Sequence, residues 1–140
     1  MWQRVSLRNY RSIEKADVVL APFTVLVGAN GSGKSNFADA LLLATEISFD
    51  AEAAIKRRGG IVSIRRWGIP ESEETSVTIR WAASDSDLQR DFWEQSFSLL
   101  PSPDTGWRFG SERLGRGEHG RKNFFKEGNS SRPPSNGRNC

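Results

Sequence analysis

A segment of eight residues in this 140-residue chain has the composition and spacing of a phosphate-binding loop. Residues 28–35 read Gly-Ala-Asn-Gly-Ser-Gly-Lys-Ser and fit the pattern G-x-x-x-x-G-K-[ST]. In such a loop, backbone N–H groups surround the phosphates of a nucleotide, and glycines let the chain approach the phosphate oxygens closely. The N-terminus of the helix that follows adds attraction for the anion. The sequence therefore predicts a site for a nucleoside triphosphate, with ATP and Mg²⁺ as the expected ligands.

Two side chains at the end of the motif have distinct expected roles. The ammonium group of Lys34 is expected to bind the β- and γ-phosphates, which makes Lys34 the candidate catalytic residue. The hydroxyl group of Ser35 is expected to supply one ligand to Mg²⁺. The residues expected to bind the nucleotide in this segment are Gly28, Ala29, Asn30, Gly31, Ser32, Gly33, Lys34, Ser35 and Asn36. The alternative is a glycine-rich turn that binds nothing.

A strand and a helix on either side of the motif are expected to hold it in place. Residues 23–27 read Phe-Thr-Val-Leu-Val, an apolar run that is typical of a central strand buried on both faces. From Lys34 onward, apolar residues recur at helical spacing, which predicts one buried helix face. That face consists of Phe37, Ala40, Leu41, Ala44 and Ile47. The order strand, loop, helix is the context that a phosphate-binding loop requires.

The remaining elements predict an α/β fold. Strands are expected at residues 3–7, 16–21, 61–65, 76–82 and 106–110. Helices are expected at residues 51–58, ending at Gly59 and Gly60, and at residues 88–99. The predicted fold class is therefore a P-loop NTPase core of strand, loop and helix with an antiparallel β-rich extension.

The composition excludes several classes of protein. Cys140 is the only cysteine, so neither an internal disulfide nor a cysteine-rich zinc module is possible. The longest apolar run, residues 40–44, is far shorter than the ~20 residues that cross a bilayer, and the N-terminus lacks the apolar core of a signal peptide. We therefore expect a soluble, cytoplasmic protein with no membrane partner. Its net charge of +3 permits contact with nucleic acid but does not require it.

The composition of the chain changes near residue 115. Residues 115–140 contain five glycines and two prolines, and their only large apolar residues are Phe124 and Phe125. Such a segment buries too little apolar surface to offset the entropy lost on ordering. We therefore expect a folded lobe over residues 1–114 and a disordered or non-native tail over residues 115–140.

Two segments together resemble the N-terminus of ABC-type AAA-family ATPases. They are residues 7–13, Leu-Arg-Asn-Tyr-Arg-Ser-Ile, and residues 20–36, which contain the phosphate-loop motif. The resemblance covers residues 1–65 well and points to the ATPase heads of RecF, SMC, Rad50 and OLD-nuclease proteins. It implies that residues 1–114 are the N-terminal lobe of an incomplete ABC-type head. Transporter ATPases share this core but rarely carry a segment like residues 9–13, and they are the second alternative.

The resemblance also implies a function and partners. In this family two heads enclose ATP: one contributes the phosphate loop and the other a signature loop with an L-S-G-G-like core. The usual settings are DNA repair, DNA maintenance and phage defence. The implied partners are therefore ATP, a second ATPase head or the missing C-terminal lobe, DNA, and a nuclease.

Three residues other than glycine, lysine and serine gain a role from the same resemblance. Asn30 and Asn36 are typical of these heads at their positions in and after the loop. Arg11 matches an arginine that approaches the bound phosphates in related heads. A surface ion pair of Arg11 with Glu14 or Asp17 is the alternative interpretation, and the sequence favours neither.

Hydrolysis of ATP needs groups that the sequence does not contain. An acidic residue after four apolar residues, followed by a catalytic glutamate, would hold Mg²⁺ and activate water. No such run and no L-S-G-G-like signature occurs in the chain. His119, Gln89 and Gln95 are poor substitutes, because a solvated loop or a helix surface explains them better. The chain therefore resembles the front half of a head that is inactive by itself; the alternative is a non-catalytic nucleotide-binding fragment or interaction module.

Two further groups of residues could contact nucleic acid. A basic cluster near Gly59 and Gly60 could bind phosphates or simply form solvated helix ends. It consists of Lys56, Arg57, Arg58, Arg65 and Arg66. The chain also has five widely spaced tryptophans, which could stack on bases, although packing in a core or a subdomain explains them better. They are Trp2, Trp67, Trp81, Trp93 and Trp107.

Overall fold

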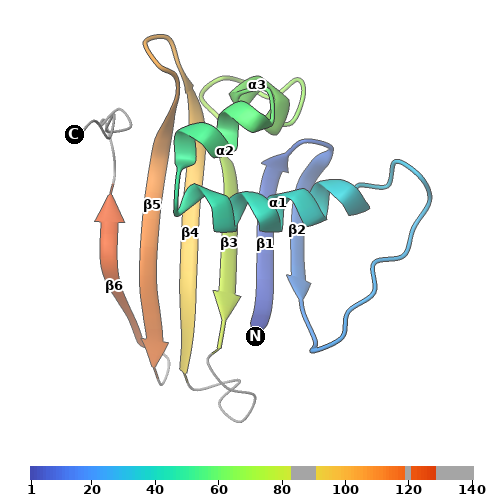
Figure 1. Ribbon diagram of the computed structural model, residues 1–140, viewed down its shortest axis with the longest axis vertical. Helices are drawn as coiled ribbons and strands as arrows, with labels where there is room; N and C mark the ends of the chain where they lie inside the picture. The colour runs from blue at the N-terminus through green and yellow to red at the C-terminus, as the bar shows by residue number, and fades with distance from the viewer. Residues whose placement is uncertain (83–90, 119–120, 129–140) are drawn as a thin grey trace.

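The computed structural model describes residues 1–82, 91–118 and 121–128. Its largest element is a six-stranded sheet in which every neighbouring pair is antiparallel and the order is β2-β1-β3-β4-β5-β6 (Figure 1). The strands are β1 (Trp2–Tyr10), β2 (Ile13–Val19), β3 (Thr75–Trp81), β4 (Asp91–Ser102), β5 (Gly106–Glu118) and β6 (Arg121–Gly128).

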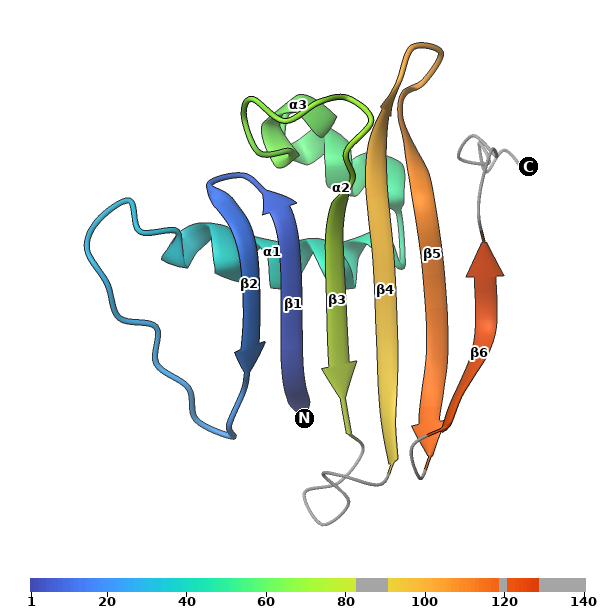
Figure 2. The ribbon, with the colours of Figure 1, turned by 180° about the vertical axis from the view of Figure 1, so that it is seen from behind.

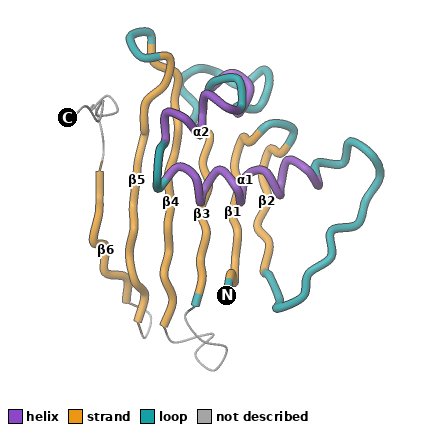
Figure 3. Tube along the Cα trace, viewed as in Figure 1, coloured by secondary structure: helices purple, strands orange, loops and turns teal. Residues whose placement is uncertain are grey.

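Three helices lie on one face of the sheet, which makes the fold a mixed α/β arrangement (Figures 1 and 3). The helix α1 (Lys34–Ile47) crosses the strands, while α2 (Ala51–Arg57) and α3 (Ile61–Ile64) lie toward one end of the sheet. Seen from behind, the other face of the sheet carries no helix of the described residues (Figure 2). None of these three helices is long and apolar enough to span a bilayer.

Strands β1 and β3 alternate between apolar and polar residues because helices cover only one face of the sheet. Val5 and Leu7 on β1 are buried opposite Ile79 and Val77 on β3. Each of these four side chains is at most 3% exposed. Complete burial of one such side chain contributes about 1.5–3 kcal/mol to stability. The alternation therefore sets which face of the sheet receives α1.

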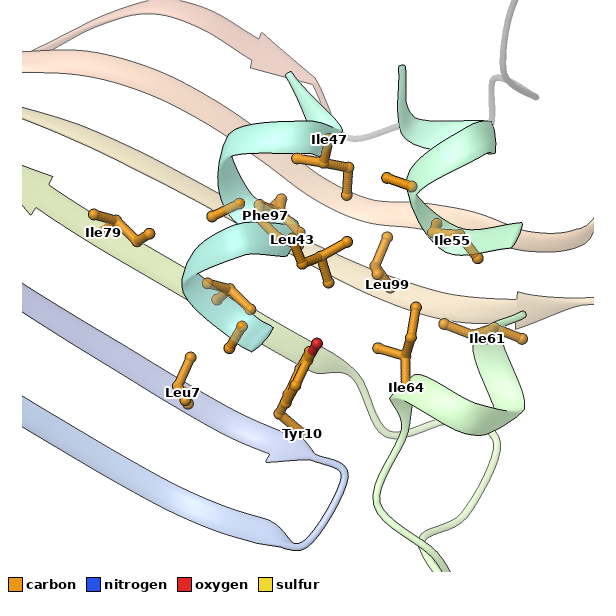
Figure 4. Packing of buried hydrophobic residues seen from close by; sticks show 14 of the residues in the cluster. Leu7, Tyr10, Leu43, Ile47, Ile55, Ile61, Ile64, Ile79, Phe97 and Leu99 are labelled. Atoms are coloured by element: carbon orange, nitrogen blue, oxygen red, sulfur yellow. The ribbon is translucent and has the colours of Figure 1, made fainter. Parts of the chain in front are cut away.

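The hydrophobic core lies between α1 and the middle of the sheet (Figure 4). Leu43 of α1 is fully buried and lies near Phe97 and Leu99 of β4, while Ile55 of α2 and Ile64 of α3 close the core at one end. The predicted helical face is confirmed, except that Leu43 rather than Leu41 is its central buried residue. The buried residues of α1 are Phe37, Ala40, Leu43, Ala44 and Ile47.

Residues 61–65 are a short helix rather than the predicted strand. The chain reverses at Gly59 and Gly60, whose φ values of 86° and 87° lie in the left-handed region that favours glycine. The helix α3 then places Ile61 and Ile64 on one side, facing the core. The short apolar pattern fits both a strand and a helical turn, and packing against the core decides between them.

The predicted helix at residues 88–99 is also wrong from residue 91 onward, because β4 begins at Asp91. Residues 88–90 lie outside the described residues. The strand β4 pairs with β3 in a register that sets Phe97 opposite Val77 and Leu99 opposite Thr75. Long-range pairing with β3 and β5 thus overrides the local helical pattern.

The predicted boundary at residue 114 does not coincide with the end of the fold. The strand β5 continues to Glu118, and β6 adds a further strand. Gly117 pairs with Phe92, whose ring lies where a Cβ on Gly117 would stand, 2.1 Å from the nearest ring atom. Pairing satisfies the backbone of these residues although few apolar side chains are available. Residues 119–120 and 129–140 of the predicted tail lie outside the described residues.

The five tryptophans occupy three different environments. Trp107 belongs to the core, at 3% exposure, whereas Trp67 is 95% exposed in the loop after α3. Trp2, Trp81 and Trp93 form a row across three neighbouring strands, since Trp2 pairs with Trp81 and Trp81 pairs with Trp93. The prediction that packing explains the tryptophans is therefore confirmed for Trp107 and for the partly buried Trp81, which packs against the core.

Candidate functional site

The apolar segment before the phosphate-loop motif is not a strand, contrary to the prediction. Residues 23–27 form a loop, in which Phe23 is 84%, Val25 63% and Val27 88% exposed. A buried central strand needs a hydrogen-bonded neighbour on each side. No strand of the described residues lies beside this segment. Of the predicted strand, loop and helix, the structure thus contains the loop and the helix.

The motif leads directly into α1, and Lys34 holds the loop together. Its Nζ atom donates hydrogen bonds to the backbone oxygens of Gly28 and Ala29, each at 2.7 Å, and to the hydroxyl of Ser32 at 3.3 Å. The backbone N–H of Ser32 also donates to the oxygen of Ala29 at 3.2 Å. The loop therefore folds back around an ammonium group at the N-terminus of a helix.

The end of the loop depends on glycine at one position and is tightly packed at another. Gly33 stands immediately before α1 with a φ of 95°, a left-handed value that favours glycine. A Cβ on Gly28 would lie 2.7 Å from the hydroxyl oxygen of Ser32, so the Ser32 side chain would have to rotate away. The turn into α1 therefore favours glycine at position 33.

The turn between β1 and β2 lies against the end of the loop. The Nδ2 atom of Asn36 donates a hydrogen bond to the hydroxyl of Ser12 at 2.8 Å. A Cβ on Gly33 would lie 3.3 Å from the same hydroxyl oxygen, so turn and loop are in close contact. Arg11 precedes Ser12 in this turn and has a φ of 48°, which is uncommon for a residue with a side chain. The structure therefore brings Arg11 and the loop into one region.

Asp39 is the centre of a polar cluster behind the loop. Its carboxylate accepts hydrogen bonds from the hydroxyl of Tyr10 at 2.6 Å and from Nε of Arg58 at 3.0 Å. The Nη2 atom of Arg11 lies 3.1 Å from the same carboxylate, so Arg11 pairs with neither Glu14 nor Asp17.

Those two acids have other partners. Asp17 accepts hydrogen bonds from Arg4 and Ser6, and Glu14 pairs with Arg66 at 3.2 Å. The cluster around Asp39 was not foreseen from the sequence. The signal that could have found it is the position of Asp39 in the helix, one turn after Ser35 and outside the apolar stripe.

Arg58 ties this cluster to the rest of the fold. Its Nη1 atom donates to Glu46 at 2.6 Å and to the backbone oxygen of Ala54 at 2.8 Å, and its side chain is only 6% exposed. Burial by itself lowers the pKa of Arg58, but the hydrogen bond that Arg58 donates to Glu46 and the charge of Asp39 outweigh it and raise the pKa. Arg58 is thus held as a permanent cation between α1 and α2.

The family model of the AAA ATPase domain matches residues 1–93 of the 140. The chain belongs to the AAA ATPase domain family. The predicted membership of an AAA-family ATPase is therefore confirmed, and it implies that this AAA ATPase domain binds nucleotide.

Individual relatives of this AAA ATPase domain are similar over parts of their length. The DNA replication and repair protein RecF of Edwardsiella ictaluri is 54% identical over 39 residues, which are 27% of this chain and 11% of that protein. RecF of Citrobacter koseri is 51% identical over 39 residues, with the same shares. The aligned segment thus spans about a tenth of the length of these relatives.

A solved structure is similar over most of the chain. It comes from work on the ATP-driven dimerization and DNA-stimulated activation of SMC ATPases. The match has a TM-score of 0.55 and 25% sequence identity, and it covers 87% of this chain and 71% of the other. The resemblance to RecF and SMC proteins is therefore confirmed at the level of the domain.

The residues of the AAA ATPase domain fit a nucleotide with Mg²⁺. The ammonium group of Lys34 already lies within the loop, and the Ser35 residue is exposed. Among the described residues, the buried Nε atom of Arg11 has no hydrogen-bond partner, so a cationic donor is available for an anion. No group of three or more metal-binding side chains occurs in the described part of the chain. Ser35 alone is the side chain expected to bind Mg²⁺, which suits an ion held mainly by phosphate and water.

The proposed substitutes for missing catalytic groups do not join this region. Gln95 lies on β4, not on a helix as predicted, and its side chain donates to the hydroxyl of Ser48 at the far end of α1. Gln89 and His119 lie outside the described residues. Gln95, the one proposed substitute within the described residues, therefore does not lie at the loop.

The basic cluster predicted from the sequence is divided in the structure. Arg58 is enclosed by Asp39 and Glu46, and Arg65 is 9% exposed and donates to the backbone oxygen of Pro70 at 2.6 Å. These two arginines hold the fold together and cannot reach a nucleic acid. The exposed cations of the cluster are Lys56, Arg57 and Arg66.

The phenol of Tyr10 makes the stability of the AAA ATPase domain depend on pH in the alkaline range. Burial, followed by the hydrogen bond to Asp39, raises the pKa of Tyr10 well above its usual value of 10.0. Because the folded pKa is raised, this contribution to stability is complete below pH 10 and is lost as the pH rises further. We expect the free energy of unfolding to fall above pH 10 by up to about 1.4 kcal/mol per pH unit from this group.

The Tyr10→Phe variant provides the measurement. Urea titrations of wild type and variant between pH 8 and about pH 11 should show a difference in stability that shrinks as the pH rises. A difference that stays constant over this range would contradict the role assigned to the Tyr10 hydroxyl.

Proposed function

We propose that this chain is the nucleotide-binding lobe of an ABC-type ATPase head of the RecF and SMC kind, and that it binds ATP with Mg²⁺ at residues 28–36. The observation that carries the proposal is the loop folded around the ammonium group of Lys34 at the start of α1. An ammonium group in a glycine-rich loop at the N-terminus of a helix suits an anion as its ligand.

In the proposed site each residue has a physical task. The backbone N–H groups of the loop and of the first turn of α1 bind phosphate oxygens, because no residue within the helix can accept from them. Lys34 neutralises charge on the β- and γ-phosphates, and Ser35 orients the metal through its hydroxyl. Mg²⁺, when bound with the nucleotide, neutralises charge that develops on the phosphates. Arg11 supplies a second cation from the neighbouring turn.

A second lobe is proposed to complete this site, because no described residues cover two surfaces beside the loop. The first is the segment of residues 23–27, whose sequence suits a central strand but which has no neighbouring strand in the described residues. The second is the outward face of α1, where Leu42 is 52% exposed and is accompanied by Ala38 and Thr45, with no charged residue. A helix that is apolar on both sides is normally buried between two layers.

Hydrolysis of ATP requires groups that we assign to the second lobe rather than to this chain. The sequence has no apolar run that ends in Asp-Glu and no signature loop. We propose that both come from the C-terminal lobe or from a second head. The names of the similar proteins, DNA replication and repair for RecF and DNA-stimulated activation for SMC, support DNA as the associated macromolecule. A nuclease partner or a role in phage defence rests on the family resemblance alone.

The second candidate is a nucleotide-binding module without catalysis, which the missing Asp-Glu run favours. A transporter-type ATPase is less favoured, because the similar proteins are RecF and SMC proteins. Titration with a fluorescent ATP analogue, followed by an assay of phosphate release, tests the proposal. We expect Mg²⁺-dependent binding that requires Lys34 and no turnover by the chain alone.

The possible results separate the candidates. Turnover that appears when a lobe with an Asp-Glu run is added supports the ATPase head. Binding that never leads to turnover with such a lobe supports the non-catalytic module. A chain that binds no nucleotide would overturn the proposed function altogether.

A further inference from the structure

The Arg11 guanidinium is poorly satisfied for a group in a packed turn. Among the described residues, its Nε atom is the buried side-chain polar atom that lacks a hydrogen-bond partner. Its Nη2 atom contacts Asp39 at 3.1 Å as an ion pair, without an aligned hydrogen bond. A guanidinium has five N–H donors, and leaving a buried one without an acceptor costs stability. Arg11 therefore has donors to offer to an anion that approaches the turn.

The backbone of Arg11 is held firmly while its side chain is not. Its φ of 48° is strained for a residue with a Cβ, and such strain persists only where the surroundings enforce it. The backbone N–H of Arg11 donates to the oxygen of Ile64 at 2.8 Å, and Tyr10 pairs with Ile13 across the turn. The turn therefore presents the Arg11 side chain from a fixed position.

Asp39 does not depend on Arg11 for its own stability. The hydrogen bonds from Tyr10 and Arg58 satisfy both of its carboxylate oxygens, at 2.6 and 3.0 Å. If the Arg11 side chain moved away, the carboxylate would keep these two charge-assisted bonds. The hydrogen bonds from Tyr10 and Arg58 thus fix the Asp39 carboxylate, whereas its contact with Arg11 can be exchanged.

The exchange would take place beside the phosphate loop. Ser12, the neighbour of Arg11, is hydrogen-bonded to Asn36 and lies against Gly33. Asp39 follows Ser35 by four residues in α1, a rise of about 6 Å along the helix axis. An extended arginine side chain is long enough to cover such a distance, so Arg11 can serve either the carboxylate or an anion at the helix N-terminus.

We propose that Asp39 is a positioning residue of the nucleotide site, which holds the Arg11 guanidinium beside the loop and releases it to the phosphates when a nucleotide binds. This inference rests on the proposed function. The carboxylate competes with the phosphates for the same cation, so its negative charge lowers the affinity for nucleotide. Tyr10 and Arg58 keep the Asp39 carboxylate in place with and without a nucleotide. The Arg11 guanidinium can therefore move between the carboxylate and the phosphates.

The Asp39→Asn variant tests the competition, because it removes the charge and retains an oxygen that can accept a hydrogen bond. We expect the dissociation constant for a fluorescent ATP analogue to fall about threefold to fivefold, as for the loss of a partly exposed ion pair. In an Arg11→Gln background, the same change should alter the dissociation constant by less than about twofold. The four proteins form a double-mutant cycle with thermal melting measured on each.

The double-mutant cycle distinguishes a positioning role of Asp39 from an effect of net charge and from a purely structural role. A uniform gain in affinity in both backgrounds would mean that only the net charge matters, and would overturn the proposal. A lower melting temperature with weaker binding in both backgrounds would mean that Asp39 is purely structural, and would also overturn it. Glu14→Gln, which removes an exposed carboxylate from the same hairpin, is the matched control and should leave the affinity unchanged.

A second measurement uses the wild-type protein and needs no folded variant. In an NMR spectrum of the arginine side-chain N–H groups, we expect the Nε–H signal of Arg11 to shift on addition of the ATP analogue and that of Arg58 to stay. A shift of Arg58 with an unmoved Arg11 would refute the exchange. If the wild type does not bind, or binds equally well without Lys34, the proposed function itself fails; Lys34-dependent binding without coupling between Arg11 and Asp39 overturns only this inference.

Discussion

Replacing Lys34 with alanine is expected to weaken the binding of an ATP analogue by about 100-fold. The estimate follows from the loss of charge-assisted hydrogen bonds to the phosphates, which contribute about 3 kcal/mol together, where about 1.4 kcal/mol corresponds to a factor of ten. In the structure the ammonium group contacts only atoms of its own loop. Its removal should therefore change nucleotide affinity far more than it changes the stability of the fold.

The controls for this variant come from the same chain. Lys15→Ala removes an exposed lysine from β2, on the strand next to the turn, and should change the dissociation constant by less than about twofold. Melting curves of both variants should match the wild type within about 0.5 kcal/mol. Equal affinity of Lys34→Ala and wild type would remove the basis of the nucleotide site.

Replacing Arg58 with methionine is expected to produce the largest loss of stability, about 3–5 kcal/mol. The methionine fills a similar volume, but Asp39 and Glu46 lose their shared cation, and the backbone oxygen of Ala54 loses a donor. Two carboxylates, 24% and 22% exposed, then lose their shared counter-charge, and among the described residues only the ion pairs of Asp39 with Arg11 and of Glu46 with the exposed Arg57 remain. Urea unfolding at neutral pH measures the difference in the free energy of unfolding.

Arg57 offers a matched control for this second prediction. It is the preceding residue and also faces Glu46, but at 3.7 Å and with a side chain that is 61% exposed. Exposed ion pairs contribute little, so Arg57→Met should cost no more than about 0.5 kcal/mol. Arg58→Lys keeps the charge but not the planar set of N–H donors, so its loss of stability should lie between those of Arg58→Met and Arg57→Met. A loss as small for Arg58→Met as for Arg57→Met would show that the buried cluster is not needed for the fold.

Sequence patterns alone were sufficient for the parts of this fold that depend on local rules. The glycine spacing and the apolar stripe after it predicted a loop that leads into a helix, and α1 begins at Lys34 as expected. Helix α2 ends before Gly59 as the glycine pair indicated, and β1, β2 and β3 overlap the segments 3–7, 16–21 and 76–82 in which strands were expected. These features depend on neighbours within a few residues, which the sequence shows directly.

Residues 23–27 show where a local pattern predicts the wrong structure. Their apolar run has the composition of a central strand, yet a strand exists only where another backbone accepts and donates its hydrogen bonds. In the described residues no such backbone is present, so the same five side chains stay in a loop that faces solvent. The pattern identified a segment suited to burial, and in the described part of the tertiary structure no strand pairs with it.

The amino-acid sequence by itself determined the family, the phosphate-loop motif and the helix that follows it, because each depends on the type and spacing of adjacent residues. The tertiary structure alone decided that residues 91–102 are a strand, that residues 61–64 are a helix and that Arg11 faces Asp39. These outcomes depend on partners that are distant in the sequence: Phe97 pairs with Val77, and Arg11 meets a carboxylate on α1. Contacts of that kind arise from the packing of the whole sheet, which no local pattern contains.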